Sequence, residues 1–143
     1  MLKSIKFLVA ATAFSLAAIP AAAQEAEEPR TTYAVTAFSF TDDADQNRWL
    51  EVMDTYINPA RVAAGMAPET VHWVMLGGDY DIILIAEVPD GMSTFDSHSP
   101  ASRMAFVSAL TDLVGGEEEL AALNEEMSGM TKDSTTLYTH THP

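Results

Sequence analysis

Two histidines lie in settings that could support proton transfer. His98 belongs to the polar segment Asp96-Ser97-His98-Ser99, just before a predicted helix, and His72 lies in an alternating apolar stretch. A neutral imidazole in a partly dry cleft can act as a general base, since it titrates near neutral pH. Each residue also has a structural interpretation: a capping loop for His98, and a hydrogen-bonded core or interface residue for His72. If the protein is an enzyme, the sequence favours His98 for proton transfer, with His72 as the second candidate.

Several large side chains could hold a ligand beside such a base. Tyr56, Trp73 and Tyr80 could line a pocket for a flat apolar compound, although aromatic residues at this spacing also occur simply as core. Arg103 follows His98 by about one helical turn and could bind a carboxylate through two parallel hydrogen bonds. Alternatively, Arg103 forms a surface ion pair that contributes little to stability. These four residues are the predicted substrate-binding set.

The segment His140-Thr141-His142 offers two imidazoles that could share a metal ion. It places two imidazoles on one side of a predicted strand. A zinc site takes three or four protein ligands, and no nearby spacing supplies the third. The chain has no cysteine, no Gly-x-Ser-x-Gly nucleophile motif and no glycine-rich phosphate loop. The sequence therefore predicts neither a metal site nor a cofactor.

The stretch that must position these residues is the tight turn at Gly77–Asp79 and the strand that follows it. In that strand Ile82, Leu84, Ala86 and Val88 point to one face, and Ile83 and Ile85 point to the other. A strand with apolar side chains on both faces needs cover on both. A chain of this length can build one helical layer, so the second face is predicted to pack against another copy of the protein.

The remaining patterns predict an α+β domain. Strands are expected over 31–40, 70–76, 80–88 and 135–141. Helical stripes run from Trp49 to Ile57, with an interruption and a new cap at Asn58-Pro59, from Met104 to Val114, and from Glu117 onward. The order strand, helix, strand, strand, helix, strand predicts a ferredoxin-like βαββαβ fold, a four-stranded antiparallel sheet with helices on one face.

The first 23 residues have the pattern of a secretory signal peptide. Lys3 and Lys6 precede an apolar run over 7–19, and Ala21-Ala22-Ala23 offers a cleavage site. The alternative, an uncleaved anchor, is disfavoured because a membrane span needs about 20 apolar residues. Residues 24–30 are expected to form a disordered leader, and residues 31–143 a single domain. The predicted location is the periplasm or the extracellular space.

The charge of the chain limits its partners. The net charge is −14, and cleavage would remove two of the seven basic residues and none of the 21 acidic ones, which leaves −16. Such a chain repels nucleic acid and anionic lipid at long range. The sequence therefore predicts no nucleic-acid partner and no membrane partner after cleavage.

The central turn and strand resemble a known superfamily. Gly78-Asp79-Tyr80-Asp81, the aliphatic strand and the exit Glu87-Val88-Pro89-Asp90 are similar to the dimeric α+β barrel superfamily, and most of all to its GYD-type domains. The resemblance implies two sheets packed face to face, with Tyr80 and Asp81 as structural positions. It leaves the chemistry open, since the superfamily includes cofactor-free enzymes, haem-handling proteins and simple ligand binders. The chain lacks a clear histidine in the middle of a helix, which argues against haem handling.

The functional expectation combines the residues with the resemblance. The chain is expected to be an exported homodimer that binds, or acts without a cofactor on, an apolar or aromatic compound between sheet and helices. One alternative is a non-catalytic dimeric interaction module. Another is a periplasmic metal- or haem-binding protein.

Overall fold

The elements follow the predicted order in a computed structural model that describes residues 30–142. The predicted signal peptide and most of the predicted leader lie outside the described residues and stay predictions. The elements are β1 (Thr32–Phe40), α1 (Gln46–Val52), a π-helical turn η1 (Met53–Ile57), α2 (Asn58–Ala63), β2 (Thr70–Trp73), β3 (Ile82–Glu87), a 3₁₀ segment η2 (Gly91–Asp96), α3 (Ala101–Val114), α4 (Glu117–Met130) and β4 (Thr131–His140).

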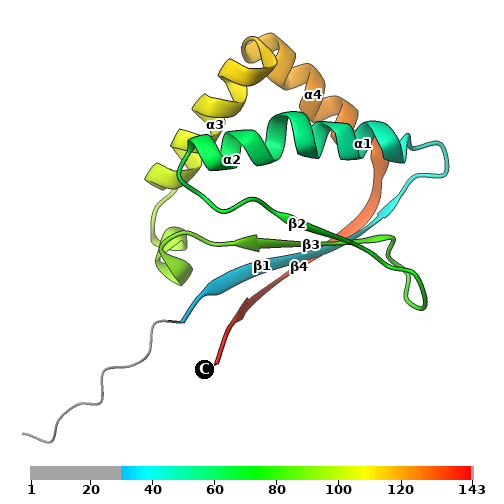
Figure 1. The fold of residues 1–143 in the computed structure, drawn as a ribbon, viewed down its shortest axis with the longest axis horizontal. Coiled ribbons are helices and arrows are strands. Elements are labelled where there is room, and N and C mark those ends of the chain that lie inside the picture. The colour runs from blue at the N-terminus through cyan, green and yellow to red at the C-terminus, as the bar shows by residue number, and fades with distance from the viewer. Residues whose placement is uncertain (1–29, 143) are drawn as a thin grey trace, which may run out of the picture.

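The four strands form one antiparallel sheet in the order β2-β3-β1-β4. Helices α1 to α4 all lie on one side of this sheet (Figure 1). This strand order with helices on one face is the ferredoxin-like arrangement, so the predicted fold class is confirmed.

Strand β3 has the two apolar faces that its sequence predicts. Ile82 is wholly buried beneath the helices and lies opposite Phe38 of β1. Ile83 and Ile85 point to the other face, where they lie opposite Ala37 and Val35. No helix of the described chain covers that face (Figure 1). We call this uncovered side the open face.

The first helix is continuous where an interruption was predicted. Asp45 caps its start by accepting hydrogen bonds from the backbone N–H groups of Asn47 and Arg48. Asn58 has ordinary helical backbone angles, and its N–H donates to the carbonyl of Met53, five residues earlier. Proline lacks an N–H and its ring crowds the carbonyl of the preceding turn. The wide turn η1 accommodates Pro59 because it moves the carbonyl of the preceding turn away from the proline ring. The helix therefore continues through Asn58, and the predicted cap at Asn58 is wrong.

Helices α3 and α4 meet at an angle (Figure 1) and are joined by Gly115 and Gly116. Both glycines have positive φ, 105° and 147°, which side-chain-bearing residues rarely adopt. Helix α3 packs mainly against α2, η1 and α4. Its predicted apolar stripe is therefore only partly buried: Leu110 is in the core, whereas Met104 and Leu113 remain about half exposed.

The Gly-Asp-Tyr-Asp turn ends in a residue that fastens the β2–β3 hairpin to β1. Asp81 Oδ2 accepts a hydrogen bond from the backbone N–H of Phe40 at 2.8 Å. The backbone N–H of Asp81 donates to the carbonyl of Phe38, and its carbonyl accepts from Val74, both at 2.9 Å. Strand pairing ends at Ile82, and Asp81 extends the attachment with its side chain.

Candidate functional site

A pocket lies between the helix-facing side of the sheet and the helices above it. Its volume is about 300 Å³. The lining residues come from β1, α1, η1, β3, α4 and β4, and none of them is charged. They are Thr36, Phe38, Trp49, Met53, Ile57, Leu84, Asn124, Met127, Thr131 and Ser134. We call this cavity the sheet–helix pocket.

An aromatic cluster fixes the inner wall of the sheet–helix pocket. Phe38 and Phe40 alternate along β1 toward the helices, and Trp49 of α1 packs on both, with ring centres 5.2 and 5.8 Å away. All three side chains are at least 94% buried. Aromatic pairs in tilted or edge-on contact hold one another in place. The pocket therefore has one rigid aromatic wall.

Polar groups are few and lie mainly where β4 and α4 meet the pocket. Asn124 and Ser134 are exposed and present an amide and a hydroxyl there. On the sheet, the hydroxyls of Thr36 and Thr136 share a hydrogen bond of 2.9 Å across β1 and β4. Such a lining suits an apolar compound that carries one or two neutral polar groups.

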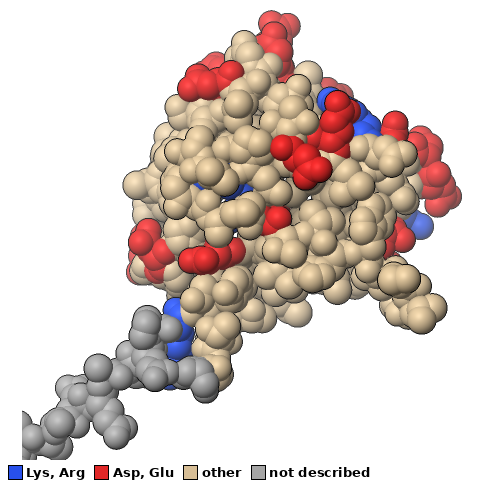
Figure 2. Space-filling model, in the orientation of Figure 1, with Lys and Arg blue, Asp and Glu red and all other residues tan. Residues whose placement is uncertain are grey.

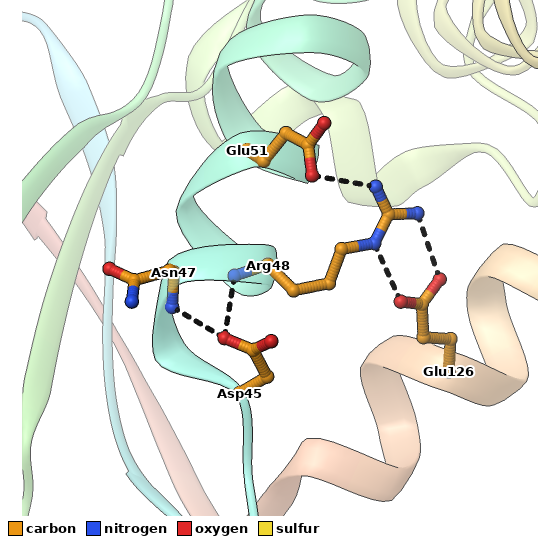
Figure 3. Close-up of polar contacts among 5 residues, drawn as sticks. All are labelled: Asp45, Asn47, Arg48, Glu51 and Glu126. Carbon is orange, nitrogen blue, oxygen red and sulfur yellow. Dashed lines mark hydrogen bonds and ion pairs between the residues drawn. The ribbon is translucent and has the colours of Figure 1, made fainter.

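A second hollow of about 260 Å³ lies between α1, η1, α3 and α4. Arg48 holds one side of it through a two-pronged contact with Glu126, from Nε at 2.7 Å and from the second guanidinium nitrogen at 3.1 Å (Figure 3). It also donates to Glu51 at 3.0 Å. Hydrogen bonds with Arg48 hold the pKa of Glu126 below its ordinary value, and the same bonds raise the pKa of Arg48. The guanidinium is therefore already occupied by the protein's own carboxylates.

The six residues predicted from the sequence are dispersed over the molecule. His72 lies opposite Ile83 and points to the open face. Trp73 points toward the helices, with its ring centre 6.1 Å from that of Phe40, and is 43% exposed. Tyr56 lines the second hollow.

The other three lie at the surface or near it. Tyr80 is half-buried in the hairpin loop, His98 is exposed in the loop before α3, and Arg103 is exposed on α3. None of the six lines the sheet–helix pocket. His98 and Arg103 therefore lie close together in the chain around the start of α3, whereas His72 lies on the open face. Their catalytic and binding roles stay predictions.

A buried ionic cluster that sequence reasoning did not find joins α2 to the sheet. Arg61 is only 8% exposed. It donates to the carbonyl of Ala67 at 2.8 Å, to Glu69 Oε1 at 3.1 Å and to the carbonyl of Glu87 at 3.2 Å. The side chain of Asn58 completes the cluster by bonding to both the N–H and the carbonyl of Glu69. Arg61 therefore connects α2 to the loop before β2 and to the end of β3.

The two paired glutamates should respond to pH in opposite directions. Burial raises the pKa of Glu69 above its ordinary value of 4.5, and the nearby Arg61 charge only partly offsets this. A raised native pKa gives a stabilising contribution that is complete below the unfolded-state pKa and is lost as pH rises through the native one. For Glu126 the native pKa is lowered, so its contribution is present above the unfolded-state pKa and is lost as pH falls through the native one.

We therefore expect Glu69→Gln and Glu126→Gln to change the pH profile of stability in opposite ways. In the native protein, Glu69 lowers the unfolding free energy as pH rises above 4.5, and Glu69→Gln should abolish this decrease. Glu126 lowers the unfolding free energy as pH falls below 4.5, and Glu126→Gln should abolish that decrease. Both side chains of the Arg48–Glu126 pair are about a third exposed, so its neutral-pH contribution should stay under about 1 kcal/mol. Urea unfolding between about pH 3 and pH 8 measures both effects. Glu125→Gln, exposed on α4, is the control, and profiles parallel to this control would contradict the assignment.

Comparison with known proteins gives similarity to solved structures only. No protein-family model matches the chain, and no curated protein matches it. A NIPSNAP family protein of unknown function from Agrobacterium tumefaciens is similar with a TM-score of 0.49 and 12% identity, over 78% of this chain and 87% of that one. A dimeric ferredoxin-like protein of unknown function from Thermobifida fusca is similar with a TM-score of 0.47 and 12% identity, over 78% and 92%. A dimeric protein of unknown function with a ferredoxin-like fold from Bacteroides fragilis gives 0.41 and 14%, over 78% and 96%.

Proposed function

We propose that this chain binds a small, neutral, apolar or aromatic compound in the sheet–helix pocket. The observation that carries the proposal is the uncharged lining of a cavity of about 300 Å³ with one aromatic wall. Small-molecule pockets usually have about 300–1,000 Å³ and are mostly apolar with a few placed polar groups. The pocket is therefore sized for a compound of one or two rings.

The lining favours binding over catalysis. A reaction needs a proton donor, a proton acceptor or a nucleophile within reach of the bound compound. The pocket contains hydroxyls, one amide and two methionines, and none of the predicted bases. Proton transfer by His98 or His72 stays a prediction of the sequence, and simple binding is the function that we put forward.

We also propose that the protein works as a homodimer formed through the open face. This face carries Val35, Ala37, Ile83 and Ile85 along the two central strands, and Leu137 of β4, which is 62% exposed. In the view of Figure 2, acidic side chains gather over the helices and turns, and the lower part over the sheet and the β2–β3 hairpin is mostly uncharged. A second copy would shield these apolar side chains from water.

Export is the third part of the proposal. It rests on the signal-peptide pattern of residues 1–23, which lie outside the described residues. Within residues 30–142, no helix has the length and hydropathy needed to cross a membrane.

The ligand proposal is tested by closing the pocket from its rim. Asn124→Trp should fill it, because Asn124 is an exposed lining residue. Ala121→Trp adds the same side chain to an exposed position of α4 that lies outside the lining. A thermal-shift screen of residues 24–143 with neutral one- and two-ring aromatic compounds and quinones supplies the ligand. At a hundred times its Kd a ligand stabilises the native state by about 2.7 kcal/mol.

We expect at least one compound of this class to raise the Tm of the native protein and of Ala121→Trp. The same compound should leave the Tm of Asn124→Trp unchanged. A screen without any shift, or equal shifts in the two tryptophan variants, would contradict the proposal.

A further inference from the structure

The two histidines at the end of β4 lie with their ring nitrogens close together. His140 Nε2 and His142 Nε2 are 3.0 Å apart, the ring centres are 4.7 Å apart, and the ring planes differ by 57°. Both side chains are exposed. Because the nitrogens are much closer together than the ring centres, both Nε2 atoms point into the space between the two rings.

The backbone holds the two rings on the same side of the strand. Thr141 donates its N–H to the carbonyl of Thr31 at 3.1 Å, and its hydroxyl accepts the N–H of Thr31 at 3.3 Å. Pairing with the chain before β1 therefore continues one residue past His140. In a paired extended segment, residues two apart point the same way.

The spacing fits a chelated metal ion. Metal–imidazole bonds are about 2.0–2.1 Å long, so two nitrogens 3.0 Å apart would subtend about 91–97° at the ion. With each bond in line with its ring, the ring centres would then stand about 4.6–4.7 Å apart. The observed separation is 4.7 Å. A tetrahedral ion would instead need nitrogens about 3.3–3.4 Å apart at the same bond length.

We propose that His140 and His142 chelate one divalent ion of tetragonal geometry, Cu²⁺ or Ni²⁺. An angle near 90° is typical of these ions with nitrogen and oxygen ligands, and imidazole nitrogens suit both. Within residues 30–142 no group of three or more His, Cys, Asp or Glu side chains could hold a metal. Water therefore completes the coordination, and the ion remains exposed and exchangeable.

The protons balance without an added base. In the present arrangement one Nε2 carries a hydrogen and donates to the other, so both rings can be neutral. Binding requires that the donor ring move its proton to Nδ1, which leaves both Nε2 lone pairs for the ion.

The test titrates tag-free protein, residues 24–143, with Cu²⁺ alone. Calorimetry gives the affinity and stoichiometry, and electron paramagnetic resonance gives the geometry and the number of bound nitrogens. We expect one ion per chain, a tetragonal spectrum and two imidazole nitrogens. Loss of an outer-shell partner weakens metal binding by about 10–100-fold. His140→Gln and His142→Gln, which each remove a direct ligand, should therefore weaken it at least about tenfold.

His72→Gln and His98→Gln are the matched controls. Each removes one imidazole elsewhere in the chain, and both should leave affinity and spectrum unchanged. His140 and His142 are exposed at the end of the sheet, so replacing them should not unfold the protein, and a loss of Cu²⁺ affinity can be assigned to the lost ligands. Absence of Cu²⁺ binding, a single bound nitrogen, or equal affinity in the double variant His140→Gln/His142→Gln would overturn the proposal.

Discussion

Replacing Arg61 by methionine should lower the free energy of unfolding by about 3–5 kcal/mol. Methionine keeps much of the apolar stem but removes every donor of the guanidinium. The carbonyls of Ala67 and Glu87 would each lose a hydrogen bond, and the Glu69 carboxylate, whose side chain is only 18% exposed, would lose its counter-charge. Removing one member of a buried ion pair is costly because the other charge remains without a partner. Urea denaturation followed by tryptophan fluorescence measures the change.

Three further variants make the Arg61 result specific. Arg61→Lys keeps the charge but loses the fork that reaches three acceptors, so its loss should be intermediate. Arg103→Met makes the same chemical change at an exposed position of α3 and should stay within about 0.5 kcal/mol of the native protein. Arg61→Met/Glu69→Gln should be less destabilised than the sum of its single changes, because the stranded charge is gone. A loss for Arg61→Met no larger than that for Arg103→Met would refute the structural role.

Introducing a carboxylate at Ile85 should separate the proposed homodimer. Ile85 lies on the open face between Val35 of β1 and Thr70 of β2, at the centre of the apolar surface. A glutamate there would be buried at the interface without a counter-charge, which costs several kcal/mol. We expect Ile85→Glu to raise the dimer Kd at least about a hundredfold. Sedimentation velocity over a range of protein concentrations measures the shift from dimer to monomer.

Two controls separate loss of association from loss of folding. Ser108→Glu adds the same charge at an exposed position of α3 and should leave the dimer intact. Far-UV circular dichroism of Ile85→Glu should keep the native shape, since the substituted side chain faces away from the core. A native protein that stays monomeric at all concentrations would contradict the proposed homodimer. It would mean that a different molecule covers the open face, or that none does.

Local patterns predicted the fold because each of them acts within one element. The alternation around Ile82 and Ile83 correctly assigned both faces of β3, and the carboxylates at Glu117 marked the start of α4. β4 begins at Thr131, four residues before its predicted start, because it follows α4 without a loop. The apolar stripe predicted for α3 is only partly buried, because that helix packs on other helices and leaves part of the stripe in water.

The site was harder to predict because its parts come from distant positions. The sheet–helix pocket draws on six elements, and its lining residues are ordinary core and surface types that no short motif marks. Burial of Arg61 could not be read from its neighbours in the chain, because its acceptors Glu69 and Glu87 come from two later segments. The sequence did place His140 and His142 on one side of a strand, but only the structure supplies the distance between their nitrogens.

The wide turn η1 makes the length of the first helix as important as its composition. Each helical residue turns the chain by about 100°, so losing one residue there would rotate one end of the helix against the other. Trp49, packed on the two phenylalanines of β1, and Arg61, bonded to the end of β3, could then no longer both face their present neighbours. Exposed side chains of this helix can be exchanged without moving either anchor, but an insertion or deletion between Trp49 and Arg61 would displace one of the two.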